Sequence, residues 1–387
     1  MENRDADYTQ EYADRIAAWE SMAVAEICRE IGDIGKMTPE QAKKYNAEKQ
    51  AKKIEKTVVS ALSVVMIASI QSLPKTYTSA FDEVHRECEY MYKYRDIPFV
   101  DVSDDKAARK LAKQYAKKNG AELMQFAKTK AIKALNDTGQ PVALRKQILQ
   151  YFSDASKVVI DGKTDFYSAM RKTVLDLGGS GFRVEYPSGI TRRLDTVVRQ
   201  NMLYNVKMSC AEYSRQIGEE LGCNGIEVSF SANPRPSHRF MEGKQYAKHG
   251  GKTVNGVYYE GADEAGVYDR LYKDYNCNHR ETPIILGVSE PRYSPKELER
   301  LKAENERKFT INGKTGDGYY WSQKMRDLET ETRKSKGQIN ALKALGNSEP
   351  EIAELNKRVA AYRKKYNKIA DLTGIAKEPK RMKVSNP

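Results

Sequence analysis

The chain has 387 residues, of which 40% are hydrophobic and 31% are charged. This balance excludes global disorder and is typical of a folded protein with two or three domains of ordinary size. The formal net charge of +13 is uneven, because residues 291–387 hold 23 Lys/Arg against 13 Asp/Glu, a net +10. The basic C-terminal part indicates contact with something anionic, such as nucleic acid or an acidic protein surface.

Cysteine usage and hydropathy point to a cytosolic product. The five cysteines are odd in number and scattered, which argues against a disulfide framework and favours a reducing compartment. The polar, acidic start of the chain is unlike a secretory signal. The most apolar stretch, residues 58–70, contains three serines in 13 residues and is too short to span a bilayer. We therefore expect a buried helix there and no membrane partner.

Residues 1–177 are expected to be an almost entirely helical region. Apolar residues recur at helical spacing over 7–34. Thr38 and Pro39 then form the pattern of an N-cap and a first helical residue, and the helix that they begin is expected to break at Pro74. Further helices are expected over 104–135 and 141–152.

Residues 178–290 predict a small α+β domain with β-hairpins. One hairpin is expected around the Pro-Ser-Gly turn between 182 and 194, and another at Asn255-Gly256, a strong hairpin signal. The Gly-Gly-Ser-Gly run at 178–181 lacks the Gly-Lys-Ser/Thr of a phosphate loop, which favours a plain linker. A helix over 195–221 and a strand over 226–230 complete the domain.

Residues 291–387 predict an antiparallel helical hairpin and a basic tail. Helices are expected over 321–345 and 349–372, joined by Gly346-Asn347-Ser348. The second helix carries an apolar seam with spacings of three and four, made of Ile352, Leu355, Val359, Tyr362, Tyr366 and Ile369. The whole chain is therefore expected to be α+β and predominantly helical.

The candidate chemistry lies in a group of histidines and one cysteine. Cys277 and His279 are two residues apart, and His238 and His249 precede them. A Zn²⁺ site needs His or thiolate ligands that the fold brings together, and the predicted hairpin between the two segments permits this. The irregular spacing favours a metal-free polar core instead. A catalytic Cys-His pair is less favoured, because no orienting third group is evident.

A tyrosine-rich run, EYMYKYRD at residues 89–96, has two interpretations. Aromatic residues interleaved with basic ones can stack on nucleic-acid bases. Half-exposed tyrosines are also common at protein interfaces. We favour protein contact here.

Two longer stretches carry a family resemblance. They are GCNGIEVSFSANPRPSHRFMEGKQYA and NCNHRETPIILGVSEPRYSPKEL, followed by a basic helical hairpin that begins with Tyr-Tyr-Trp. Their residues and order resemble the phage minor capsid protein 2 family, which is akin to Mu F-type head-morphogenesis proteins. The motif residues, expected to form a structural cluster, are Arg235, Pro236, Ser237, His238, Gly243, Asn276, Cys277 and His279. The likeness covers about residues 180–375 and is architectural over the N-terminal helices.

The resemblance implies a virion structural protein with no enzymatic activity and no cofactor. Such a protein is present in the host cytoplasm during assembly and then lies inside the phage head near the portal vertex. It assists assembly and DNA packaging or delivery, with the portal protein and capsid proteins as partners, on which residues 1–177 are expected to dock. Non-specific contact with packaged DNA is expected from basic residues of the hairpin and tail: Arg358, Arg363, Lys364, Lys365, Lys380 and Arg381.

Two other functions stay open from the sequence. The first is a metal-dependent nuclease or transferase that acts through His238, Cys277 and His279. The second is a free nucleic-acid-binding protein, against which stands the lack of a recognisable reader motif.

Overall fold

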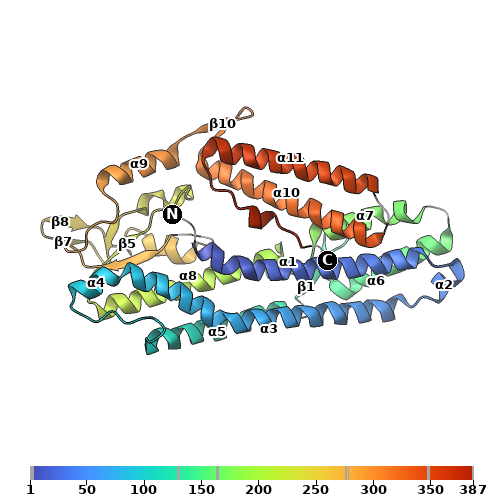
Figure 1. Cartoon of the computed structure of the whole chain (residues 1–387), viewed down its shortest axis with the longest axis horizontal. Helices are drawn as coiled ribbons and strands as arrows, with labels where there is room; N and C mark the ends of the chain where they lie inside the picture. Colours follow the sequence, from blue (N-terminus) through green and yellow to red (C-terminus); the bar gives the residue numbers. More distant parts are fainter. Residues whose placement is uncertain are drawn as a thin grey trace. The chain divides into compact units, whose positions relative to one another are not determined.

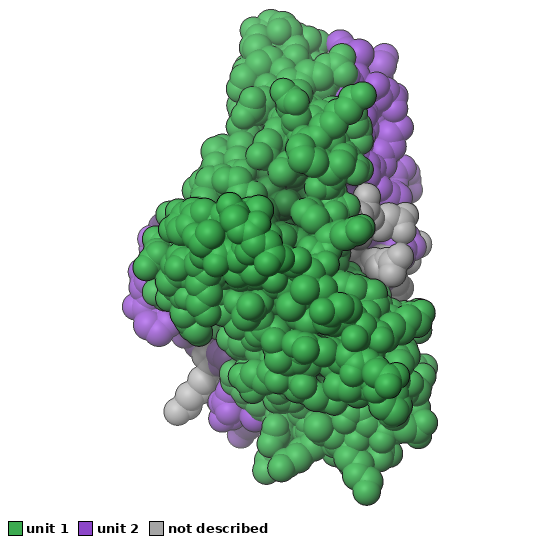
Figure 2. Space-filling view, turned by 90° about the vertical axis from the view of Figure 1, so that its left-hand side faces the viewer, with its two compact units in different colours: residues 1–9, 71–120, 200–323 green, residues 10–70, 121–199, 324–387 purple. Residues whose placement is uncertain are grey.

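The structure, a computed structural model, describes residues 4–128, 131–162, 165–274, 277, 279–346 and 349–385. The chain divides into two units, shown in Figure 2: unit 1 is Met1–Thr9, Gln71–Gly120 and Gln200–Gln323, and unit 2 is Gln10–Ile70, Ala121–Arg199 and Lys324–Pro387. Each unit takes segments from all three regions expected from the sequence. The boundaries at 178 and 291 are therefore not boundaries of the units, and the three-region division stays a prediction.

Helices form most of the described chain, with small antiparallel sheets between them (Figure 1). The α-helices are α1 (Arg4–Gly35), α2 (Pro39–Lys44), α3 (Ala47–Glu87), α4 (Glu89–Tyr94), α5 (Lys106–Phe126), α6 (Leu144–Asp161), α7 (Phe166–Ser180), α8 (Leu194–Glu220), α9 (Pro295–Glu306), α10 (Gly318–Leu345) and α11 (Glu349–Thr373). Short helical turns are η1 (Pro236–Met241), η2 (Asp269–Lys273) and η3 (Pro379–Met382). The predicted class, α+β and predominantly helical, is confirmed.

Among the described residues, the strands make four small sheets. They are β1 (Ile132–Leu135), β2 (Pro141–Ala143), β3 (Arg183–Glu185), β4 (Thr191–Arg193), β5 (Gly225–Val228), β6 (Gln245–Ala247), β7 (Lys252–Val254), β8 (Val257–Tyr259), β9 (Glu281–Ile284), β10 (Phe309–Ile311) and β11 (Lys314–Gly316). Their orders are β2-β1-β3-β4 in unit 2, and β6-β5-β9, β7-β8 and β10-β11 in unit 1. The hairpin at Asn255-Gly256 is confirmed, and both residues have the positive φ that its tight turn needs.

The predicted helix start at Thr38 is confirmed in full. Its hydroxyl accepts a hydrogen bond from the backbone N–H of Gln41 at 3.2 Å, and the Gln41 side chain accepts one from the Thr38 N–H at 2.8 Å. This reciprocal capping box satisfies two N–H groups that have no partner inside the helix. Pro39 occupies the first turn, as expected.

The single helix expected from Thr38 to Pro74 is wrong in two respects. Helix α2 ends at Lys44 and α3 begins at Ala47, and α3 then continues through Pro74. A proline inside a helix costs about 3 kcal/mol. Leu73, Tyr77 and Phe81 are fully buried at a spacing of four residues on either side of it. Each such side chain gains about 1.5–3 kcal/mol on burial, so their packing outweighs the lost backbone hydrogen bond.

The apolar part of α3 is buried on one face only. Ile54, Val58 and Met66 are buried, whereas Val64 and Ile67 are 66% and 48% exposed. The expectation of a buried helix over 58–70 thus holds for one side of the helix. Among the described residues, α3 is the one helix that is long and apolar enough to cross a membrane by length and composition, with 28% of its apolar window buried. A single helix of this kind is weak evidence for a membrane span.

The predicted helices over 104–135 and 141–152 are interrupted by a β-hairpin. Helix α5 ends at Phe126, and β1 pairs with β2 through an Asn-Asp-Thr-Gly turn. The Asn136 side chain accepts hydrogen bonds from the N–H groups of Thr138 and Gln140, and Gly139 has a φ of +79°. This turn chemistry overrides the helical composition of the preceding residues.

The Gly-Gly-Ser-Gly run is not the linker that the sequence favoured. Gly178 lies in α7, where a Cβ atom would come within 2.7 Å of the Ala341 Cβ and of the Gly337 carbonyl oxygen of α10. A Cβ on Gly337 would clash in turn with the Gly178 carbonyl oxygen. Both glycines are therefore needed for the close approach of two helices inside unit 2.

The C-terminal helical hairpin is confirmed. The hydroxyl of Tyr366 in α11 donates to Glu329 of α10 at 3.1 Å, which fits an antiparallel pair with a short connection. Five of the six seam residues are buried, and Tyr362 is half-buried. Asn347 and Ser348 of the predicted connection lie outside the described residues.

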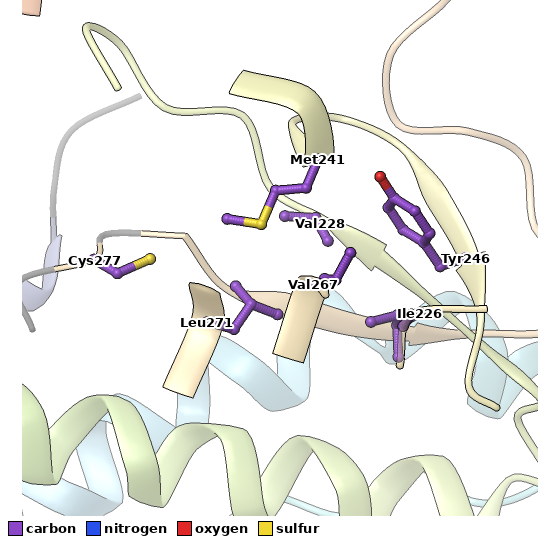
Figure 3. Packing of buried hydrophobic residues seen from close by; sticks show 8 residues of the cluster. Ile226, Val228, Met241, Tyr246, Val267, Leu271 and Cys277 are labelled. Carbon is purple, nitrogen blue, oxygen red and sulfur yellow. The ribbon is translucent and has the colours of Figure 1, made fainter. Parts of the chain in front are cut away.

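In unit 1 the small sheet β6-β5-β9 supports the candidate site. Its central strand β5 pairs antiparallel with both neighbours, and Val228 faces Glu281 in the register with β9. A buried cluster covers the sheet; Figure 3 shows Ile226, Val228, Met241, Tyr246, Val267, Leu271 and Cys277. The cysteine sulfur thus lies at the edge of a hydrophobic core.

A buried aspartate anchors η1 within unit 1. The Asp317 carboxylate accepts hydrogen bonds from the Arg239 guanidinium at 2.7 Å and from the Tyr320 N–H, at the start of α10, at 2.9 Å. Burial raises the pKa of Asp317, but these hydrogen bonds and the nearby positive charges lower it below its usual value. Arg239 directly follows His238, so this contact fixes the turn that carries the histidine.

Candidate functional site

The structure brings three of the sequence-predicted residues together in unit 1. His238 lies in η1, and Cys277 and His279 lie just before β9. One potential ligand atom from each side chain lies within 4.8 Å of the other two, and all three residues are buried. His249 is not part of this group, because its side chain is 80% exposed and pairs with Asp263.

Local backbone geometry explains why these residues meet. Pro236 begins η1, whose tight turn directs both His238 and Met241 into the interior. Gly243 then takes a φ of +64°, and a Cβ there would come within 2.5 Å of Leu298. This position needs a glycine to lead the chain from η1 into β6.

On the other side, backbone hydrogen bonds extend the pairing of β5 and β9. The Ser229 N–H donates to the Arg280 carbonyl at 2.9 Å, and the Arg280 N–H donates to the Ser229 hydroxyl at 3.0 Å. His279 is thereby held next to the end of β5.

The two histidine rings have the same hydrogen-bonding pattern. Nε2 of His238 lies 2.7 Å from Asp274 Oδ2, and Nε2 of His279 lies 2.9 Å from Glu242 Oε1. Their other ring nitrogens face inward: the two Nδ1 atoms are 3.5 Å apart, and Cys277 Sγ is 3.5 Å from Nδ1 of His279. We call His238, Cys277 and His279 the inner triad, and Asp274 and Glu242 the outer carboxylates.

The outer carboxylates are themselves fixed. Glu242 is 1% exposed and accepts hydrogen bonds from the Ser231 N–H at 2.9 Å and from the Asn305 amide at 3.3 Å. Asp274 lies near the guanidinium groups of Arg270 and Arg235, at 3.4 and 3.7 Å. Neither carboxylate was singled out from the sequence, where acidic residues near a motif are too common to be a signal.

Electrostatics favour a thiolate in the inner triad. Burial raises the pKa of Cys277, but hydrogen bonds with His238 and His279 and the charge of Lys207 lower it to about 5. Burial lowers the pKa of His279, but its hydrogen bonds with Cys277 and Glu242 raise it above the usual value. The lowered pKa therefore favours the thiolate form of Cys277 at neutral pH, and a thiolate can bind a metal ion.

Burial favours a structural role for the triad over reaction with a macromolecular substrate. His238 and His279 are each 2% exposed and Cys277 is 8% exposed. Of the other motif residues, Pro236 and Ser237 are exposed in η1, and Arg235 reaches Asp274 from the preceding position. Asn276 lies outside the described residues.

The predicted DNA-proximal residues lie in unit 2. Arg363, Lys364 and Lys365 are exposed on α11, where Arg358 pairs with Glu354 at 3.0 Å. Lys380 and Arg381 line a small cavity together with three basic residues that sequence reasoning missed, Arg199, Arg333 and Lys383.

This cavity holds more positive than negative charge. Only two acidic residues, Asp14 and Asp195, line it beside the five basic ones. Burial and the neighbouring Arg381 and Arg333 lower the pKa of Arg199 to about 10. Among the described residues, the buried Nε atoms of Arg333 and Arg381 have no hydrogen-bond acceptor. The arrangement suits an anion.

Comparison with known proteins identifies a family. A family model described as phage minor capsid protein 2 matches residues 11–371, and thus includes the N-terminal helices as well as the motif region. No curated protein and no solved structure matches the chain. The match supports a capsid-related role in a phage, contact with other phage structural proteins and a virion location.

Proposed function

Because the chain belongs to the phage minor capsid protein 2 family, we propose that it is a structural component of the head interior near the portal. In this role it assists assembly and DNA packaging or delivery, and it acts without catalysis. The observation that carries the proposal is the family match over residues 11–371. Two surfaces of the structure support its finer parts.

The first surface is the exposed apolar face of α3, with Val64 and Ile67 at its centre. Exposed apolar side chains that are neighbours on a helix are typical of a contact with another protein. The partner that we propose is the portal protein or a capsid protein. This agrees with the docking role expected for residues 1–177.

The second surface is drawn from basic residues of unit 2, namely the exposed cations of α11 and those that line the basic cavity. If about four to six phosphates are neutralised, the logarithm of the DNA affinity falls with log[salt] at a slope of about −4 to −5. Binding of this kind is non-specific and weak at physiological salt. It fits a surface that lies near packaged DNA.

An incorporation experiment tests the proposal. Full-length Val64→Asp and Ile67→Asp variants are expressed during phage assembly, and the protein is quantified by mass spectrometry of purified heads. We expect reduced incorporation, because a buried unpaired carboxylate opposes docking. Val257→Asp is the matched control, since Val257 is also 53% exposed but lies on β8. Absence of the wild-type protein from heads would contradict the proposed function, and equal incorporation of all variants would contradict the docking face.

A further inference from the structure

We propose that the inner triad binds one Zn²⁺ ion through Nδ1 of His238, Sγ of Cys277 and Nδ1 of His279. This property is separate from the capsid role. The argument rests on ring orientation, on distances and on the second layer of contacts around the triad.

The ring orientation leaves three acceptor atoms facing one another. Asp274 and Glu242 accept hydrogen bonds at Nε2 of the two rings. Because a carboxylate is an acceptor, each Nε2 carries a hydrogen, and each ring in its neutral form presents a lone pair at Nδ1, which a metal ion takes in place of a proton. Those two lone pairs and the Cys277 sulfur point into the same small volume.

A single proton satisfies this arrangement only in part. A proton on Nδ1 of His279 can be shared with the sulfur or with His238, and the remaining acceptor is then buried without a donor. Leaving a buried polar atom unpaired is unfavourable. One cation at the centre contacts all three donors at once.

The distances agree with tetrahedral zinc. Zn–N bonds of about 2.0–2.1 Å and a Zn–S bond of about 2.3 Å place two ligand nitrogens about 3.3 Å apart and a nitrogen and sulfur about 3.6 Å apart. The observed separations are 3.5 Å between the two Nδ1 atoms and 3.5 Å between Sγ and Nδ1 of His279. The third separation, from the Cys277 sulfur to the His238 ring, is at most 4.8 Å, so this one contact must shorten for the ion to be held.

The outer carboxylates give the second layer that zinc-binding histidines usually have. A metal-bound histidine donates its other N–H to a carboxylate or carbonyl, which fixes the ring and increases its basicity. Here both histidines do so, and Glu242 is held in place by Ser231 and Asn305. Two neutral rings and one thiolate leave a charge of about +1 on the bound ion, which the carboxylates offset.

The kinds of ligand atom in the inner triad determine which metal ion it prefers. Imidazole and thiolate ligands favour Zn²⁺ over Mg²⁺ or Ca²⁺, which prefer oxygen. Among the described residues the group supplies three ligands, so the fourth position is filled by a water molecule. The bound ion links η1 to the segment before β9, on opposite sides of β5, and so stabilises unit 1.

Metal analysis of the purified full-length protein is the test. Elemental analysis after gel filtration is expected to give about one Zn²⁺ per chain in the wild type and in the His249→Ala control, whose histidine is exposed. Cys277→Ser keeps the size of the side chain and removes the thiolate, and it is expected to lower zinc content at least several-fold. Cys223→Ser is the control for loss of a buried thiol outside the triad.

Cobalt substitution adds a readout that does not depend on a variant's folding. Apo protein titrated with Co²⁺ is expected to show visible bands of tetrahedral cobalt and a near-ultraviolet thiolate band, and Cys277→Ser is expected to lose the thiolate band. A chelator is expected to lower the melting temperature of the wild type. The proposal is overturned if folded wild-type protein contains no zinc and binds neither Zn²⁺ nor Co²⁺ at micromolar concentration.

Discussion

The ion pair between Glu20 and Arg193 offers a sharp test of how unit 2 is held together. The two side chains are 6% and 17% exposed and join α1 to β4. Glu20 also accepts a hydrogen bond from the Phe182 N–H at 2.6 Å, and Arg193 lies 3.5 Å from Asp195. Burial raises the pKa of Glu20 despite the neighbouring guanidinium, so the charged carboxylate depends on its partner.

Replacing Arg193 alone should cost much more than replacing both partners. Arg193→Met leaves a buried carboxylate without its cation, which costs about 3–5 kcal/mol. Glu20→Gln keeps an acceptor for the Phe182 N–H, and Arg193 keeps its ion pair with Asp195. We therefore expect a loss of about 1–3 kcal/mol in the free energy of unfolding. The double variant should resemble Glu20→Gln alone, because no unpaired charge remains. The size of the coupling energy should therefore equal the cost of Arg193→Met, about 3–5 kcal/mol.

Urea unfolding followed by tryptophan fluorescence measures these changes in the free energy of unfolding, and it can be restricted to unit 2. The chain has two tryptophans, Trp19 in unit 2 and Trp321 in unit 1. In a Trp321→Phe background the signal comes from Trp19, whose ring lies 5.3 Å from that of Phe182. A loss of about 4 kcal/mol with a slope of roughly 2–3 kcal/mol per molar urea lowers the midpoint by about 1.5 M.

Arg192→Met is the neighbouring control, since this arginine is exposed on β4. It should cost less than about 1 kcal/mol. Additive single and double variants, with a coupling below about 0.5 kcal/mol, would refute the reasoning that this pair is a coupled buried unit.

Three further predictions concern packing, pH and DNA. Gly337→Ala should destabilise unit 2 by about 1–3 kcal/mol in urea unfolding, because its Cβ clashes with the Gly178 carbonyl; an unchanged midpoint would contradict the close helix contact. Asp317 has a lowered pKa, so its stabilising effect is present above the unfolded pKa of about 3.9 and is lost as pH falls through the lower folded value. Asp317→Asn should therefore lower the melting temperature more at pH 7 than at pH 3, and the reverse order would refute this. Lys364→Ala should reduce the salt slope of DNA binding by up to about 1, while Lys52→Ala leaves it unchanged; equal slopes in all three proteins would place the DNA contact elsewhere.

Local signals in the sequence predicted local structure well. The capping box at Thr38, the Asn255-Gly256 hairpin and the seam of α11 each depend on residues that are close together in the chain. Pro74 and Gly178 were misread because their surroundings come from distant segments. Burial of one face of α3 offsets the energetic cost of Pro74 inside the helix. The close approach of α10 leaves no room for a Cβ atom at Gly178.

The candidate site shows the same limit. His238, Cys277 and His279 were identified because unusual residue types stood out in the motif region. Glu242 and Asp274 were not, since only the path of the chain from η1 to β9 brings them to the histidine rings. Arg199 and Arg333 were missed for the same reason, because the basic cavity joins them to residues near the C-terminus.

The division of each unit among separate segments has a consequence for synthesis on the ribosome. Unit 2 needs Gln10–Ile70 together with Lys324–Pro387. At about 5–20 residues per second, the first of these segments waits about 15–50 s for the last to emerge. During that interval α1 lacks its contact with α10, where Gly32 lies against Leu345, and the incomplete unit favours binding by chaperones and aggregation at high expression. This unit is therefore completed only after Lys324–Pro387 has been synthesised, and chains that terminate before Lys324 are expected to leave unit 2 incomplete and to be degraded.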